Sequence, residues 1–325
     1  MNLSHHPIDR TIATSCVLLA AVSLGFAGCG SAKPARTASA RVSAPSSMQH
    51  HHHHRVNAGR PDPTRLVVTA DDYSFETDQA TVRPGPLRVV LHNEGSEAHQ
   101  VQIGRTDGHL TPDQFVDLYH REGDLASVRA LTWVGGVSVI DPGERSEATV
   151  ELPPGDYLLV CYVPAPDGIS HVMKGMVASL HVTGSPTATA DSAAGEGTGD
   201  AGRAGRTGPV ATVTLSDYHI ELPTGFRGRG EVAFRNNGHE PHEVVFMRLD
   251  DGKTLADAAA YQADSEQPAP FSFAAGIASI APGTRATADL DLEPGDYIAT
   301  CFVPGPGPGH EQHIALGMLT TFTVH

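Results

Sequence analysis

The stretch PGDYIATC, residues 294–301, decides the fold of this chain because it occurs twice. Its twin is PGDYLLVC, residues 154–161. In each copy the cysteine is followed by a loop rich in Pro or Gly, then by a histidine, and five residues later by the methionine of a Gly-Met pair (Gly175-Met176 and Gly317-Met318). The chain therefore contains one cluster of sulfur and nitrogen side chains in two copies.

Other landmarks repeat around this stretch in the same order, which indicates an internal duplication. They are Asp72-Tyr73 and Asp217-Tyr218, Asn93-Glu94-Gly95 and Asn236-Asn237-Gly238, His99 and His242, Gly136 and Gly276, and Pro142-Gly143 and Pro282-Gly283. A segment rich in Gly, Ala, Thr and Ser, residues 184–208, separates the copies and predicts a linker. We therefore expect one domain over residues 65–183 and a second over residues 209–325.

Length, composition and charge limit the class of protein. A chain of 325 residues is long enough for two domains with their own cores. Its 34 glycines and 24 prolines favour short strands joined by turns over long helices. The net charge of −15 argues against a nucleic-acid partner, which would require a basic face for the phosphates.

Apolar and polar residues alternate with the period of a β-strand on both sides of the repeated stretch. The residues that share a face are His99, Val101 and Ile103, then Tyr157, Leu159 and Cys161, and in the second copy His242, Val244 and Phe246, then Tyr297, Ala299 and Cys301. Each histidine and each cysteine thus lies at the end of an apolar stripe that faces a core. Short strands with Pro-Gly turns predict an antiparallel β-sandwich in each domain.

One short helix is expected within each domain. Thr111-Pro112-Asp113-Gln114 has the residues of a capping box with proline at the first helical position, and Thr254 opens the counterpart in the second domain.

The N-terminus has the pattern of an export signal. Arg10 precedes an apolar run over residues 12–26, and small residues follow before Cys29. Residues 26–29, FAGC, resemble the lipobox of bacterial lipoproteins, which implies removal of residues 1–28 and a lipid on Cys29. The alternative is an uncleaved membrane anchor. Both readings place the bulk of the chain outside the cytoplasm, bound to the cell membrane and facing the periplasm or the cell exterior.

Residues 29–64 lack an apolar period and predict a disordered tether between the lipid and the first domain. Within this tether lies a run of histidines, His50–His54. Such a run can capture copper or zinc loosely. It can equally be an expression scar or an accident of low complexity.

The cysteine count points to the repeated stretch. Of four cysteines, Cys16 lies in the signal and Cys29 is the expected lipid attachment site, which leaves Cys161 and Cys301, one for each domain. A single thiol in an exported domain is buried and inert, paired with a thiol of another domain, or bound to a metal.

A histidine from one strand end, a cysteine from another, and a histidine and methionine from the loop after the cysteine would meet at one pole of such a sandwich. Two imidazole nitrogens, a thiolate and a weak axial thioether form the ligand set of type 1 copper. The candidate ligands are His99, Cys161, His171 and Met176 in the first domain and His242, Cys301, His313 and Met318 in the second. The alternative is that they are packed core residues, as single buried His, Cys and Met residues usually are.

With these ligands and the Asn-x-Gly turns before His99 and His242, each copy resembles a cupredoxin, the family of plastocyanin, azurin and the domains of copper nitrite reductase. The resemblance covers nearly all of both domains and implies a Greek-key β-sandwich with one copper ion. The five-residue interval from histidine to methionine fits the plastocyanin-like pattern. The interval from cysteine to histidine, ten residues in the first copy and twelve in the second, is longer than in small electron carriers and is similar to nitrite-reductase-type domains. His310 competes with His313 for the ligand role, and His313 is preferred because it keeps the spacing to Met318.

The resemblance implies an exported copper protein that passes single electrons to or from an unidentified redox partner. Neither domain contains the His-x-His pairs of multicopper oxidases, and Val160 and Thr300 precede the cysteines where two-domain nitrite reductases have a histidine, so enzyme activity is not expected. Two alternatives remain open. One is copper sequestration or delivery to a chaperone or acceptor, and the other is a metal-free cupredoxin-like module that binds a partner.

Overall fold

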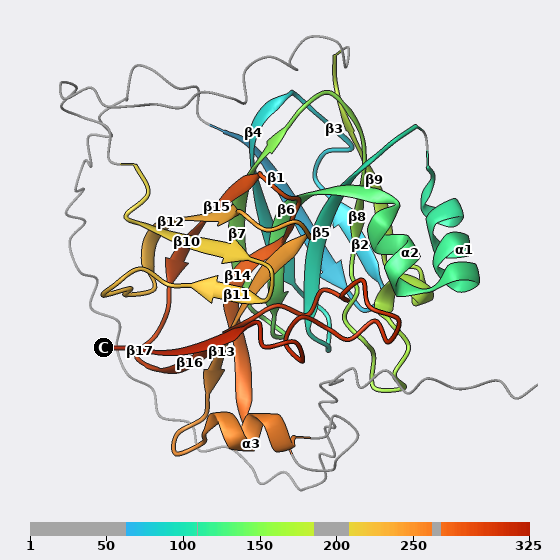
Figure 1. Ribbon diagram of the computed structural model, residues 1–325. Helices are drawn as coiled ribbons and strands as arrows, with labels where there is room; N and C mark the ends of the chain where they lie inside the picture. Colours follow the sequence, from blue (N-terminus) through green and yellow to red (C-terminus); the bar gives the residue numbers. More distant parts are fainter. Residues whose placement is uncertain (1–62, 109, 185–207, 262–267) are drawn as a thin grey trace, which may run out of the picture.

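The computed structural model describes residues 63–108, 110–184, 208–261 and 268–325, and its regular structure consists mainly of β-strands (Figure 1). The expected signal segment, the lipid site Cys29 and the histidine run His50–His54 lie outside the described residues. No described helix is long and apolar enough to cross a membrane.

The first half contains nine strands, two α-helices and one 3₁₀ turn among the described residues. They are β1 (Thr64–Asp71), β2 (Ser74–Thr77), β3 (Thr81–Val82), β4 (Gly85–Asn93), β5 (His99–Thr106), α1 (Pro112–Glu122), α2 (Asp124–Arg129), β6 (Leu131–Ile140), β7 (Arg145–Leu152), β8 (Gly155–Val160), η1 (His171–Lys174) and β9 (Val177–Val182).

The second half repeats this order with eight strands and one α-helix among the described residues. They are β10 (Ala211–Ser216), β11 (His219–Glu221), β12 (Arg229–Asn236), β13 (His242–Leu249), α3 (Leu255–Ala260), β14 (Phe271–Ile280), β15 (Arg285–Asp291), β16 (Gly295–Thr300) and β17 (Leu319–Val324).

The strands form two sheets, and both sheets run continuously through the two halves. The eight-stranded sheet has the order β11-β10-β12-β15-β7-β4-β1-β2, and the nine-stranded sheet has the order β17-β16-β13-β14-β6-β5-β8-β9-β3. The halves join where β15 pairs with β7 and where β14 pairs with β6, both antiparallel. The expected all-β sandwich is confirmed, and its two copies share their sheets edge to edge.

Most strand pairs are antiparallel, but β1 pairs with β4, β10 with β12, and β3 with β9 in parallel. The first two parallel pairs occupy the same place in each half. The sequence did not indicate them, because period-2 alternation is the same in parallel and antiparallel strands.

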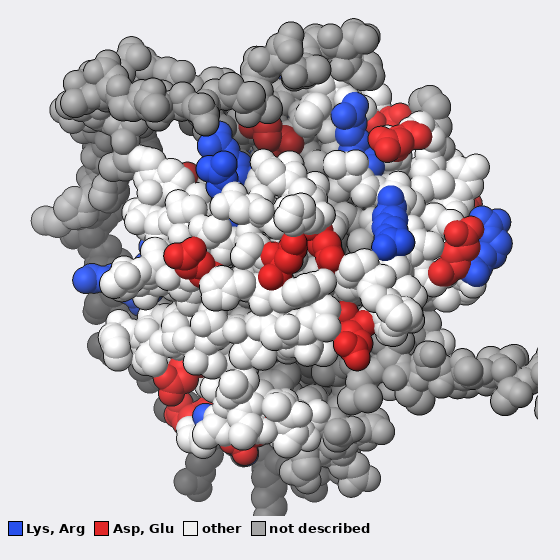
Figure 2. Space-filling model, in the orientation of Figure 1, with Lys and Arg blue, Asp and Glu red and all other residues white. Residues whose placement is uncertain are grey.

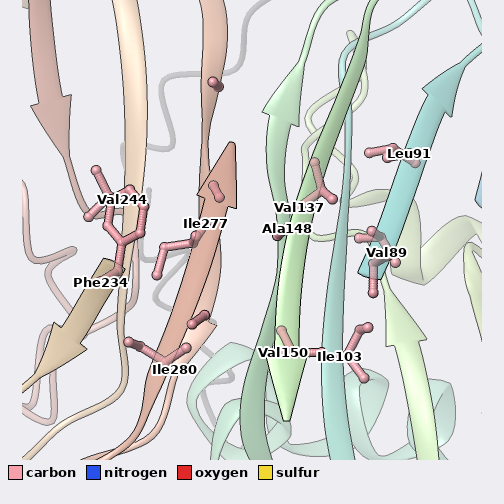
Figure 3. Close-up of a cluster of buried hydrophobic side chains, with 14 of the residues drawn as sticks. Val89, Leu91, Ile103, Val137, Ala148, Val150, Phe234, Val244, Ile277 and Ile280 are labelled. Carbon is pink, nitrogen blue, oxygen red and sulfur yellow. The ribbon is translucent and has the colours of Figure 1, made fainter. Parts of the chain in front are cut away.

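The core is a single apolar cluster that extends across both halves. Figure 3 shows side chains from the first half, such as Val89 and Ile103, and from the second, such as Phe234 and Ile277, in this cluster. All members of the predicted stripes except the two histidines belong to this cluster, including Tyr157, Leu159 and Cys161. The stripes therefore face the space between the two sheets, as the alternation predicted.

The helices lie outside the sandwich (Figure 1). Thr111 caps α1 with the predicted capping box, in which its hydroxyl accepts from the Gln114 N–H and the Gln114 side chain accepts from the Thr111 N–H. Thr254 caps α3 in the same way with Asp257. The first half contains a second short helix, α2, where one helix was expected. It begins after Gly123, whose φ of 83° ends α1.

Charged side chains of both signs are interspersed over the face shown in Figure 2.

Candidate metal centres

In the first half, three donor side chains meet at one end of the sandwich. His99 is the first residue of β5, Cys161 directly follows β8, and His171 begins η1. The two Nδ1 atoms of the histidines are 3.0 Å apart, and the Cys161 Sγ lies 3.4 Å from Nδ1 of His171 and 3.9 Å from Nδ1 of His99. All three residues are fully buried.

The second half repeats this geometry with His242, Cys301 and His313. The Nδ1 atoms are 3.1 Å apart, and the Cys301 Sγ lies 3.4 Å from Nδ1 of His313. The donor atoms of each group lie within 4.8 Å of one another. An ion about 2.0–2.3 Å from three donors in a trigonal plane would separate them by roughly 3.5 Å, so each group fits one metal ion.

Each of these imidazoles contacts a carboxylate through Nε2, the ring nitrogen that faces away from the cysteine. Nε2 of His99 lies 3.2 Å from Asp72 and Nε2 of His171 lies 2.8 Å from Glu97. In the second half, Nε2 of His242 lies 3.1 Å from Asp217 and Nε2 of His313 lies 2.8 Å from Glu240. A carboxylate accepts hydrogen bonds, so each ring donates from Nε2 and presents the Nδ1 lone pair to the cysteine side. This arrangement prepares the rings for a metal.

Burial favours the neutral form of the histidines. It lowers the pKa of His99, His171, His242 and His313, although the nearby carboxylates act in the opposite direction. Neutral imidazole is the form that binds a metal ion, so no proton has to leave these rings near neutral pH.

The two aspartates behind the rings stay ionised because they accept hydrogen bonds from the same loops. Burial opposes ionisation of Asp217, but hydrogen bonds from His239, His242 and the Glu240 N–H lower its pKa to about 2. Burial likewise opposes ionisation of Asp72, and hydrogen bonds from Ser96, His99 and the Glu97 N–H lower its pKa below the usual value. An ionised aspartate therefore lies behind one histidine of each donor group.

A tyrosine completes this arrangement in each half. Tyr73 donates its hydroxyl to Glu97 at 2.8 Å, and its ring lies edge-on to His171 with 5.1 Å between centroids. Tyr218 has the same relation to Glu240 and His313. Both tyrosines have a left-handed backbone, with φ of 69° and 63°. Such strain in a residue other than glycine is most often kept where function requires it.

The Asn-x-Gly turns fasten the loops that carry the carboxylates. The Asn93 side chain donates to the carbonyl oxygens of Glu97 and Ile140, and accepts from the Gly95 N–H. Asn236 makes the same bonds in the second half. A Cβ on Gly95 would meet the Asp72 carboxylate and Nε2 of His99, so the turn leaves no room for a side chain there.

The two thiols are free, and no disulfide joins them. Burial raises the pKa of Cys161 to about 12, opposed by the N–H groups of Gln100 and Val163, and burial also raises the pKa of Cys301. A thiol with so high a pKa ionises only if a cation takes the place of its proton. The cysteines are therefore inert toward solvent and suited to a bound metal.

Met176 and Met318 are fully buried in the apolar cluster that contains the cysteines. The backbone brings them close, because the carbonyl oxygen of each methionine accepts from the N–H of the cysteine in its half. His310 stays outside the donor group, and His313 belongs to it. His310 is exposed and lies on the loop before Gln312, so the structure decides between the two histidines in favour of His313.

Sequence reasoning missed the carboxylates and gave the tyrosines no role. Asp72-Tyr73 and Asp217-Tyr218 were visible as repeated pairs, and this repetition was the signal. Glu97 and Glu240 also repeat, two residues before the ligand histidines, but a glutamate in a loop has no distinctive pattern.

No family model matches the chain, and no curated protein matches it. Among solved structures it is similar to dithionite-reduced auracyanin from Roseiflexus castenholzii, at 20% identity and a TM-score of 0.28, over 37% of this chain and 98% of that one. It is similar to auracyanin A, a "blue" copper protein of Chloroflexus aurantiacus, at 15% identity and a TM-score of 0.27, over 38% of this chain and 100% of that one. It is also similar to a copper-containing nitrite reductase from Thermus scotoductus, at 14% identity and a TM-score of 0.22, over 80% of this chain and 61% of that one.

These likenesses are low, and the character of the sites rests on the residues of this chain. The chain is a two-layer β-sandwich with one buried His–Cys–His group in each half, and each group has the nitrogen and sulfur donors of a type 1-like copper site. The resemblance to blue copper domains drawn from the sequence is confirmed for the fold class and for the His–Cys–His group in each half.

Proposed function

We propose that this protein is a one-electron carrier outside the cytoplasm that holds one copper ion in each half. The ligands are His99, Cys161, His171 and Met176 in the first site and His242, Cys301, His313 and Met318 in the second. The observation that carries the proposal is the same buried donor group in both halves, with each ring locked by a carboxylate. When bound, copper supplies the one-electron couple.

The chain's own residues suit electron transfer better than copper delivery. Each ligand comes from a β-strand end or the turn beside it, so the donor positions change little between oxidation states. The cysteine and both histidines of each group are fully buried, which leaves an acceptor protein no free ligand to attack first. A delivery site would have to expose at least one donor.

The lipoprotein-like segment before Cys29 supports membrane attachment outside the cytoplasm. Two unpaired, fully buried thiols also fit an oxidising compartment, because burial protects them from disulfide exchange. One redox partner is a second protein that docks near one of the two sites.

The test is copper reconstitution of the purified protein. We expect two copper ions per chain and an intense visible band from thiolate-to-copper charge transfer. The double variant Cys161→Ser with Cys301→Ser should bind copper weakly and lose the band. The matched control Cys29→Ser should keep the full band and move the protein from the membrane fraction to the soluble fraction. A colourless copper-loaded protein would refute the carrier, and an unchanged membrane fraction would refute the lipid anchor.

A further inference from the structure

A cavity of about 370 Å³ lies between the two halves, on the face of the nine-stranded sheet that points away from the core. It is lined by α2 of the first half and by the loop after β16 of the second, which run close to each other in Figure 1. Its exposed lining residues, Glu122 and His310, mark the side that opens to solvent. A space of this size holds one aromatic ring with its substituents.

The cavity lies against both metal centres. Four of its lining residues directly follow a ligand: Gln100 after His99, Tyr162 after Cys161, Glu243 after His242, and Phe302 after Cys301. Successive side chains of an extended chain point to opposite faces of a sheet, so the ligands face the copper and their neighbours face the cavity. A molecule in the cavity would be separated from each site by one layer of backbone, on the order of 10 Å from each sulfur.

The lining selects the charge of the occupant. It contains the carboxylates Glu122, Asp124 and Glu243 and no lysine or arginine among the described residues. An anion is excluded by this field, whereas a neutral or cationic molecule is accepted.

The lining also selects the shape and polarity. Trp133, Tyr162, Phe273 and Phe302 offer rings to a flat apolar body. Glu243 is only 3% exposed and lines the cavity. Its oxygens accept from the Phe302 N–H at 3.0 Å and from the Gln102 side chain at 2.9 Å, and each oxygen keeps room for a second hydrogen bond. The occupant should therefore bring hydroxyl donors.

We propose that this cavity binds a small aromatic diol, a hydroquinone or catechol, which reduces both copper sites. Such a ring gives up two electrons and two protons, and the chain offers two one-electron acceptors beside one cavity. Both O–H bonds break, the protons pass to water at the open side, and the diol becomes a quinone. Copper ions held by the two His–Cys–His groups would supply the acceptors, and each Cu(II) would take up one of the two electrons. This electron step rests on the proposed function, whereas binding of the diol does not.

Binding is tested on the metal-free protein by fluorescence. Trp133 is the chain's one tryptophan and lines the cavity, so its emission reports occupancy. Hydroquinone should quench it saturably with a Kd of about 1 mM or below. Terephthalate, a flat ring with two carboxylates, should bind at least about tenfold more weakly. Absence of saturable quenching by hydroquinone, or equal binding of the dianion, would overturn the proposal.

The electron step is tested by rapid mixing of copper-loaded protein with hydroquinone. We expect bleaching at a rate that saturates with concentration, and two copper ions reduced per hydroquinone consumed. Val139→Phe, which fills the cavity, should slow this reduction at least about tenfold. It should leave reduction by hexaammineruthenium(II) unchanged. The matched control Val210→Phe, at a position 67% exposed and outside the cavity lining, should behave as the parent protein.

The outcomes separate this inference from the proposed function. A blue protein whose reduction rate rises linearly with hydroquinone and ignores Val139→Phe would overturn the electron step and leave the carrier intact. Quenching of Trp133 in a protein that never turns blue would refute the carrier and the electron step, and support the diol site alone.

Discussion

The two halves of the chain present the same groups to the metal and different groups one residue further away. Each half has the same donor atoms, the same carboxylates that contact the rings and the same tyrosine. The residue after the first histidine is Gln100 in one half and Glu243 in the other, and the residue after the cysteine is Tyr162 or Phe302. Duplication has thus preserved the metal chemistry, while the face toward the cavity between the halves has diverged.

The difference follows from a polar contact that residues of both halves form together. Gln102 of the first half donates to Glu243 of the second and accepts from the Ser279 N–H. The position equivalent to Gln102 in the second half is Val245, which cannot return such bonds. The polar contact between the halves is therefore asymmetric, although both halves contribute equivalent strands to the nine-stranded sheet that it spans.

The largest effect is expected on the free energy of unfolding, from substitutions in the sheet that both halves share. Gly136 and Gly276 have φ of 132° and 140°, and a Cβ on either would collide with the carbonyl oxygen of Val101 or Val244 on the neighbouring strand. We expect Gly136→Ala or Gly276→Ala to lower the free energy of unfolding by about 4 kcal/mol or more. Because the sheets are shared, denaturant should unfold both halves in one transition.

The control for this prediction is Gly143→Ala. Gly143 has φ of 81° but open space around the added carbon, so only backbone strain of about 1 kcal/mol should appear. Equal losses at Gly136 and Gly143, or separate transitions for the two halves, would contradict the shared sheet.

A smaller effect is expected on metal affinity, and it should appear in one half at a time. Gly95→Ala places a carbon against Asp72 and His99, and Gly238→Ala places one against Asp217 and His242. Displacing the group that orients a ligand typically weakens metal binding by about 10–100-fold. Each variant should lose affinity at its own site only, measured by copper titration of the visible band. Gly307→Ala, where an added carbon meets nothing, should leave both sites unchanged.

The reduction potentials of the two sites should also differ, because only the second site has a glutamate after its first histidine. Burial raises the pKa of Glu243 to about 7, so above that pH its negative charge lies beside the second site and favours Cu(II) there. A unit charge on the residue next to a ligand, at an effective dielectric of about 20, contributes roughly 1–3 kcal/mol, on the order of 100 mV for one electron. Glu243→Gln should raise the potential of the second site by up to this amount, measured by spectroelectrochemical titration at alkaline pH.

The reciprocal variant Gln100→Glu serves as its matched partner. It should lower the potential of the first site and leave the second unchanged. Two potentials that stay fixed in both variants would show that the residue after the histidine does not distinguish the sites.

The smallest expected effect is common to both halves and appears in the metal-free protein. The native state holds His99, His171, His242 and His313 neutral because burial lowers each pKa. In the unfolded chain these histidines bind protons below about pH 6.5. The unfolded state then carries more protons, so the free energy of unfolding should fall as the pH drops from about 7 to about 5.

Denaturant unfolding at several pH values checks this sign. The variant His171→Gln with His313→Gln should show a shallower dependence, because two of the titrating rings are gone. An unfolding free energy that rises toward acid pH would contradict buried neutral histidines.

Much of the fold could be predicted from the sequence because it depends on local patterns. Alternation predicted the strand faces of Tyr157, Leu159 and Cys161, and the capping boxes predicted where α1 and α3 begin. Pairing partners were beyond this reasoning, because hydrogen bonds between strands leave no trace in the period of one strand. For the same reason the sharing of both sheets by the two halves was not foreseen.

The candidate sites divide in the same manner. Repetition of His, Cys and His at similar spacing was sufficient to predict the group of donors that the structure brings together in each half, since the residue types themselves define the chemistry. Repetition favoured His313 over His310, because His313 keeps the five-residue interval to the methionine. The course of the loop, which leaves His310 exposed and buries His313, agrees with this preference.

The sequence by itself determined that two copies of a copper-type donor set sit on β-strands, because ligand identity and strand period are properties of the chain. The tertiary structure alone decided that Asp72, Glu97, Asp217 and Glu240 lock the rings, and that a cavity opens against both sites. The physical reason is distance along the chain. Contacts such as Gln102 with Glu243 join residues of different halves, and only the folding of both halves into common sheets brings them within reach.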